Sequence, residues 1–160
     1  MLAALVGWLP AQTTTPAFDQ YRVAETFTGK PVAPVLKTVE DRAFRTMIRE
    51  GAADGPNFAG HYTIVEWGCG AGCVSIATVD ARTGTVYHGP FRNLAWTMMK
   101  YEGRYAANDD KFEQLAYKPD SRLLVARGCP EEKDCASYFY EWTGAQYKLI
   151  RKVAAVPLAP

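Results

Sequence analysis

Two histidines, His61 and His88, are the residues best suited to exchange protons near neutral pH in this chain. Two carboxylates, Glu66 and Asp80, could face one cleft with His61, and such groups serve general acid–base hydrolysis. A serine triad could also be written from Ser75, His61 and Asp80. However, Ser75 lies in a run of β-forming residues, and the Gly-x-Ser-x-Gly turn of many serine hydrolases is missing. His61 with Glu66 or Asp80 is therefore the catalytic hypothesis, and a structural hydrogen bond from His61 is its alternative.

Four cysteines form two local pairs, Cys69 with Cys73 and Cys129 with Cys135. An even number at short spacing favours disulfides in an oxidising compartment, and we expect the two local pairings. A four-thiolate zinc site is the rival, but zinc hairpins generally use Cys-x2-Cys spacing. Free thiols, or a metal site that combines His61 with the first pair, are further alternatives. We expect no metal and no cofactor.

The first cysteine pair encloses a glycine-rich loop, residues 68–73 (GCGAGC). It has neither the Gly-Lys-Ser/Thr of a phosphate loop nor the dinucleotide-binding glycine fingerprint. Glycines beside a short disulfide suit a tight turn, because that turn needs positive φ angles. The alternative is a binding loop that uses exposed backbone N–H groups. The candidate binding residues are Gly68, Gly70, Ala71 and Gly72 in this loop, and Glu131 and Lys133 in the loop over 129–135.

Composition and the N-terminus limit the class of protein. The chain has 160 residues, 18 Lys+Arg against 17 Asp+Glu, and a net charge of +1. This balance predicts no nucleic-acid binding, and no apolar run is long enough to span a membrane. Residues 1–17 carry no charge and resemble a secretory signal peptide, with a disordered apolar tail as the alternative. We therefore expect a single globular domain over 18–160 in a periplasmic or secreted protein.

The elements that would position these residues are mostly short strands. Residues 38–41 (TVED) have the form of a capping box, which predicts one amphipathic helix over 39–50 that stops at Gly51. Residues 94–101 are expected to form a short helix, and 103–110 a surface loop. Strands are predicted over 61–67, 74–79, 85–88, 115–117, 122–127, 137–142 and 146–153. Close turns between them predict an α+β, mainly β fold: an antiparallel meander sheet of six to eight strands with one N-terminal helix.

A weak internal repeat relates residues 65–87 to residues 125–147. Each segment has a strand, Gly-Cys, a short loop, a second Cys, and a hairpin that turns on Thr-Gly. This order predicts two copies of one β-meander, each braced by its own disulfide. A chance likeness between two β-hairpins is the alternative.

The segments 57–62 (NFAGHY), 67–70 (WGCG) with Cys73, 117–124 (YKPDSRLL) and 140–142 (YEW) resemble a family of uncharacterised exported bacterial proteins. The resemblance covers about residues 44–150. It implies an exported domain that carries disulfides. The family has no established activity, so the resemblance implies no reaction and no functional residues.

The sequence thus favours a non-enzymatic protein: an exported, disulfide-stabilised binding or inhibitor-like module. Its partner would be a protein or a cell-envelope polymer, recognised through the loops over 68–73 and 129–135. A small exported hydrolase that uses His61 with Glu66 or Asp80 is the alternative function. A purely structural envelope component is the third.

Overall fold

The structure is a computed structural model that describes residues 14–105 and 109–158. Three short helices precede the sheet: the 3-10 helix η1 (Phe18–Tyr21), α1 (Val39–Ala43) and α2 (Arg45–Ala53). The strands are β1 (Tyr62–Gly70), β2 (Cys73–Asp80), β3 (Val86–His88), β4 (Leu94–Ala95), β5 (Met99–Tyr101), β6 (Arg104–Tyr105), β7 (Leu115–Ala116), β8 (Leu123–Pro130), β9 (Ala136–Trp142), β10 (Tyr147–Ala154) and β11 (Val156–Pro157).

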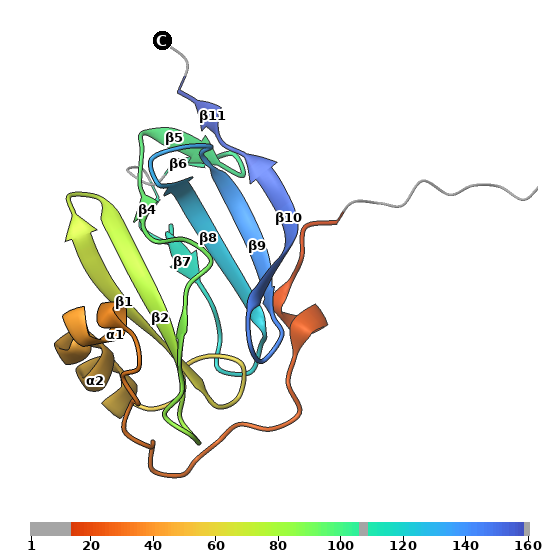
Figure 1. The fold of residues 1–160 in the computed structure, drawn as a ribbon. Coiled ribbons are helices and arrows are strands. Elements are labelled where there is room, and N and C mark those ends of the chain that lie inside the picture. Colours follow the sequence, from red (N-terminus) through yellow and green to blue (C-terminus); the bar gives the residue numbers. More distant parts are fainter. Residues whose placement is uncertain (1–13, 106–108, 159–160) are drawn as a thin grey trace, which may run out of the picture.

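The strands form one eight-stranded sheet and one small sheet (Figure 1). The main path runs β1-β2-β4-β8-β9-β10, with β3 paired to β2 and β7 paired to β8; the small sheet has the order β11-β5-β6. All pairs between these strands are antiparallel. The predicted mainly β fold is confirmed, and the seven predicted strands match β1, β2, β3, β7, β8, β9 and β10.

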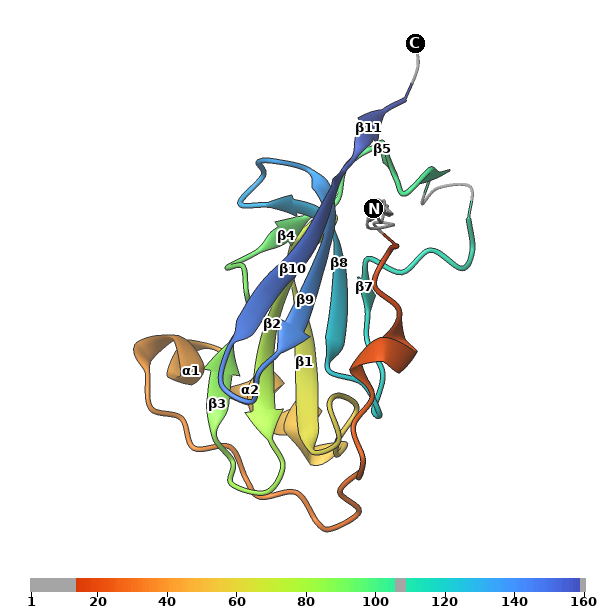
Figure 2. The same ribbon diagram turned by 90° about the vertical axis from the view of Figure 1, so that its right-hand side faces the viewer.

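The sheet curls so that its two halves face one another across a shared core (Figures 1 and 2). One half is the meander β1-β2-β3 and the other is β8-β9-β10, as the internal repeat predicts. Tyr62 on β1 and Trp142 on β9 meet at 5.2 Å between ring centroids. Thr78 Oγ1 on β2 lies 2.5 Å from the Tyr147 hydroxyl on β10. These contacts join inner faces that burial of apolar side chains holds together.

Helix α2 covers the outer face of the first meander. Ile48 and Ala52 of α2 pack against Val65, Ala77 and Val79, all of which are buried. The even-numbered residues of β1, such as Tyr62 and Ile64, lie on the other face of the strand and pack in the shared core. Alternation of side chains along the strand therefore assigns each face of β1 to a different layer.

The predicted helix over 39–50 is wrong in its continuity and its end. The capping box is present, because Thr38 N–H donates to Asp41 Oδ2 at 2.8 Å and Asp41 N–H donates to Thr38 Oγ1 at 3.0 Å. Phe44 then leaves helical geometry at φ −104° and ψ 20°, and its ring stacks on Trp67 at 4.9 Å. Gly51 does not stop α2: a Cβ there would lie 2.5 Å from Val65 Cγ1, so glycine permits close helix–sheet packing.

The prediction of a short helix over 94–101 is also wrong. Leu94 and Ala95 form β4, which pairs with β2 on one side and with β8 on the other, and residues 99–101 form β5. Leu94 is fully buried in the shared core, so a strand satisfies both its side chain and its backbone. In the predicted surface loop, Arg104–Tyr105 form β6 and residues 106–108 lie outside the described residues.

The segment 57–62 closes the lower end of β1. The Asn57 side chain pairs with the backbone of Ile64: Oδ1 accepts from Ile64 N–H at 2.7 Å, and Nδ2 donates to Ile64 C=O at 2.9 Å. Phe58 is fully buried. Gly60 has φ +87°, and a Cβ there would lie 2.5 Å from the Glu25 carbonyl oxygen. This part of the motif is therefore explained by folding.

The chain before α1 runs along the lower end of the sheet (Figure 1). Phe27 N–H donates to Gly60 C=O, and Val32 N–H donates to Ala81 C=O. Residues 1–13 of the predicted signal peptide lie outside the described residues. Within residues 14–105 and 109–158, no helix is long and apolar enough to cross a membrane.

Candidate functional site

The structure brings His61 and Asp80 together at the lower end of β1 and β2. His61 Nε2 lies 3.9 Å from Asp80 Oδ2, and Asp80 Oδ1 accepts from Arg82 N–H at 2.8 Å. Burial lowers the pKa of His61, a trend that Asp80 opposes and Arg82 adds to. The imidazole is also packed on Tyr62, with centroids 4.2 Å apart. Burial thus favours the neutral form of the His61 imidazole, which packs between Tyr62 and Asp80.

The other catalytic candidates are elsewhere. Glu66 is paired with Ile76 further along the ladder, and it accepts a hydrogen bond from the Tyr117 hydroxyl at 2.6 Å. Ser75 is five residues before Asp80 on β2, about 16 Å along an extended strand. Its hydroxyl donates to the Arg92 carbonyl oxygen at 3.0 Å. The fold therefore assembles neither the serine triad nor a His61–Glu66 pair.

Both predicted local disulfides are present, Cys69–Cys73 and Cys129–Cys135. They lie beside one another at the same end of the sheet, because β4 is inserted between the two hairpins. Ala95 pairs with Cys73 on one side and with Cys129 on the other. Two ladder steps separate the two cysteines, or about 10 Å. The candidate binding loops thus belong to one surface.

Backbone hydrogen bonds join this surface across the loops. Trp96 N–H donates to Gly72 C=O at 2.5 Å, and Glu131 N–H donates to Asn93 C=O at 3.2 Å. Arg92 N–H donates to Glu131 Oε1 at 2.8 Å. We call residues 68–73, 92–96 and 129–135 the braced surface. Its predicted binding residues Gly68, Gly70, Ala71, Gly72, Glu131 and Lys133 are all exposed.

The second loop is held in an unusual backbone conformation. Glu131, Glu132 and Asp134 have φ angles of +48°, +61° and +51°. Such angles cost a residue with a side chain roughly 1–2 kcal/mol. The Cys129–Cys135 disulfide and the bond from Glu131 to Asn93 hold this geometry. The charged side chains of this loop are therefore presented from a fixed backbone.

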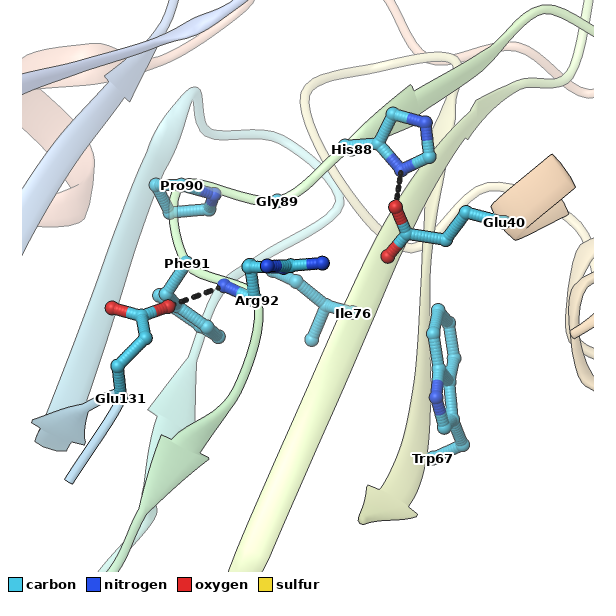
Figure 3. Close-up of a pocket in the computed structure, with 9 residues that line it drawn as sticks. All are labelled: Glu40, Trp67, Ile76, His88, Gly89, Pro90, Phe91, Arg92 and Glu131. Atoms are coloured by element: carbon cyan, nitrogen blue, oxygen red, sulfur yellow. Dashed lines mark hydrogen bonds and ion pairs between the residues drawn. The ribbon is translucent and has the colours of Figure 1, made fainter. Parts of the chain in front are cut away.

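A pocket of about 200 Å³ borders the braced surface (Figure 3). The Arg92 guanidinium extends across it from the chain after β3 toward His88 and Glu40, and Glu131 approaches Arg92 from the other side. Trp67 on β1 contributes an aromatic wall. Among the described residues, no acceptor binds the Arg92 guanidinium, so its donors remain available to a ligand.

Two carboxylates of α1 lie beside His88: Glu40, which lines the pocket, and Asp41, which is buried behind it. His88 Nδ1 lies 3.7 Å from Glu40 Oε2, and His88 Nε2 lies 3.5 Å from Asp41 Oδ1. Burial works to raise the pKa of Asp41, but hydrogen bonds from the backbone and side chain of Thr38 and from the backbone of Lys37 outweigh it, so the pKa is lowered. Asp41 therefore stays ionised and fixes α1 against His88.

Sequence reasoning did not find this pocket. Glu40, Trp67 and the run 88–92, which contains His88 and Arg92, are three separate segments, and no sequence spacing relates them. The one sequence signal was the histidine that ends the strand over 85–88, which has no acidic neighbour close in sequence. Only the placement of α1 over the first meander brings Glu40 to His88.

Among the described residues, no group of three or more His, Cys, Asp or Glu side chains could hold a metal ion. Comparison of the chain with protein-family models, curated proteins and solved structures found no match.

Proposed function

We propose that this chain is an exported binding module, periplasmic or secreted, that engages a protein partner through the braced surface. One observation carries the proposal: β4 joins the two disulfide-bearing hairpins, with Ala95 paired to both Cys73 and Cys129. Two exposed loops that are distant in sequence thereby form one surface. The local disulfides support export, since such bonds persist mainly in oxidising compartments.

The braced surface should lose little conformational entropy when it binds a partner, because its loops are already ordered. A mobile loop loses conformational entropy when it binds, roughly 0.5–1.5 kcal/mol for each side chain that is immobilised. Here the disulfides and the bonds from Gly72, Asn93 and Glu131 fix the loop backbones before any partner arrives. Glycines at 70 and 72 keep the first loop narrow, which permits close approach of a partner's backbone.

The pocket beside the surface supports a protein partner. A guanidinium next to an aromatic wall is typical of interface positions that contribute most binding energy. Arg92 and Trp67 supply this combination, and Glu40 and Glu131 on either side offer acceptors. The pocket would receive one side chain of the partner, while the two loops contact its surroundings.

The hydrolase alternative has weaker support. His61 lies near Asp80. Glu66 is on another part of β1, where it accepts a hydrogen bond from Tyr117. The cavity beside His61, of about 280 Å³, includes Arg82 and Arg122. Among the described residues that line it, none is a serine or cysteine that could act as a nucleophile. We therefore do not propose catalysis at His61.

The test is affinity capture from an envelope extract with chemical crosslinking, followed by binding measurements on the purified partner. Ala71→Arg in the first loop and Lys133→Glu in the second should each weaken that binding at least tenfold. Lys148→Glu, an exposed charge reversal on β10, is the control and should leave binding unchanged. Equal binding by all three variants would overturn the proposal.

A further inference from the structure

Within residues 14–105 and 109–158, strand β1 has one neighbouring strand, β2, and its other edge is open above Ile64. Along that edge the even-numbered residues direct their backbone groups outward. Tyr62 C=O accepts from Asn57 N–H and Phe58 N–H, and the backbone of Ile64 is bound by the Asn57 side chain. By the same alternation, Glu66 and Gly68 present the next outward N–H and C=O groups. Both residues are exposed, and among the described residues nothing pairs with those groups.

A groove of about 320 Å³ lies along this edge. Met47, Glu50 and Asp54 border it from the side of α2. Glu66 and Tyr117 border it from the side of the shared core. Glu66 is on that side because it lies on the same face of β1 as Tyr62 and Ile64. The lining includes three carboxylates and, within the part of the chain that the structure describes, no Lys, Arg or His. An exposed apolar side chain, Met47, lies among them.

We propose that the β1 edge binds an extended segment of a partner protein that carries adjacent Lys or Arg residues. The segment would add to the sheet as a further strand, with its backbone paired to Glu66 and Gly68. Neighbouring side chains of a strand point to opposite faces. One basic residue would therefore meet Glu50 and Asp54 on the α2 side, and the next would meet Glu66 on the other side.

Charge decides between this occupant and a second copy of the chain. If two copies paired through their β1 edges, Glu66 of each copy would lie against the acidic groove of the other copy. Like charges placed so close together repel. A basic segment reverses the sign of that interaction. The β1 edge shares Gly68 with the braced surface, but its residues Glu66 and Gly68 do not line the pocket at Arg92. The proposal does not require a partner at that pocket, because Ala71→Arg and Lys133→Glu lie outside the β1 edge and should leave binding of the basic peptide unchanged.

The probe is an acetylated and amidated octapeptide, Ser-Val-Lys-Arg-Lys-Val-Thr-Ser, titrated into the ¹⁵N-labelled protein. Its control replaces the three basic residues by Glu. The basic peptide should shift the amide signals of Glu66 and Gly68 saturably, and its binding should weaken in high salt because salt screens exposed charges. The acidic peptide should cause no such shift.

Two pairs of variants separate backbone pairing from charge. Gly68→Pro removes the outward N–H and should weaken binding about tenfold, whereas Gly68→Ala keeps it and should bind like the wild type. Glu66→Gln keeps an acceptor for Tyr117 but loses the charge, and should weaken binding about two- to fivefold. Arg42→Gln, on the exposed side of α1, is the control for a charge change.

Unchanged amide spectra elsewhere in each variant establish that it is folded. Equal affinity of Gly68→Pro and Gly68→Ala would overturn the pairing. Equal affinity for the basic and acidic peptides would overturn the charge selection. Shifts at Glu66 and Gly68 that depend on protein concentration without peptide would assign the edge to a second copy and overturn the proposed occupant.

Discussion

Replacement of Asn57 by alanine should destabilise the protein far more than its half-buried position suggests. The Asn57 side chain makes two hydrogen bonds to the backbone of Ile64, at 2.7 and 2.9 Å. Each is worth about 0.5–1.5 kcal/mol net, so their loss costs about 1–3 kcal/mol. Ile64 is only 3% exposed, so water reaches its freed N–H and C=O poorly. We therefore expect Asn57→Ala to lower the free energy of unfolding by about 2–4 kcal/mol.

The assay is urea unfolding followed by tryptophan fluorescence, with hydrogen exchange at the Ile64 amide. The urea midpoint should fall at unchanged m-value, and the Ile64 amide should exchange faster than in the wild type. Asn93→Ala is the matched control, because among the described residues the Asn93 side chain makes no hydrogen bond; its effect should stay within about 0.5 kcal/mol. A loss below about 1 kcal/mol for Asn57→Ala, with Ile64 still protected, would refute the reasoning.

Three further outcomes are expected. Joint replacement of Cys69 and Cys73 by serine should lower the free energy of unfolding by about 2 kcal/mol in urea titrations, as loop-closure entropy predicts; no change would contradict this. Gly60→Ala should cost more than Gly103→Ala in the same titrations: both have positive φ, but only at Gly60 would the Cβ meet backbone, at 2.5 Å. The pKa of Asp41 is lowered on folding, so its contribution is present above its unfolded pKa of about 3.9 and is lost as pH falls through the folded value. Asp41→Asn should therefore flatten the acid side of the stability profile measured from urea midpoints, and an unchanged slope would exclude Asp41 as its source.

The strands and turns could be predicted because each leaves a local signal. Alternating β-formers mark the strands, and Thr-Gly turns follow β2 and β9. The capping box at Thr38 likewise depends on residues three positions apart. By contrast, β4 has two residues, too few to show any periodicity, and its pairing is entirely long-range. The helix break at Phe44 follows from a ring stack with Trp67, which no local pattern encodes.

In the candidate site, too, features with a local sequence signal could be predicted and features that depend on long-range contacts could not. The exposed loops at 68–73 and 129–135 follow from their cysteines and glycines, so their residues could be named in advance. That the loops share a surface depends on Ala95, which pairs with both. The contact between His88 and Glu40 depends on how α1 lies over the sheet. His61 and Asp80 do come close, but Glu66 on the same strand is separated from them by its position along β1.

The short reach of both disulfides has a consequence for how the protein is made. The paired cysteines are four and six residues apart, and each pair closes the end of one hairpin. As the chain is synthesised, Cys69 and Cys73 are both present well before Cys129 and Cys135 are made. Oxidation can therefore proceed in chain order, half by half, and correct pairing does not wait for the two halves to meet. A thiol oxidase alone should suffice for maturation, without a disulfide isomerase.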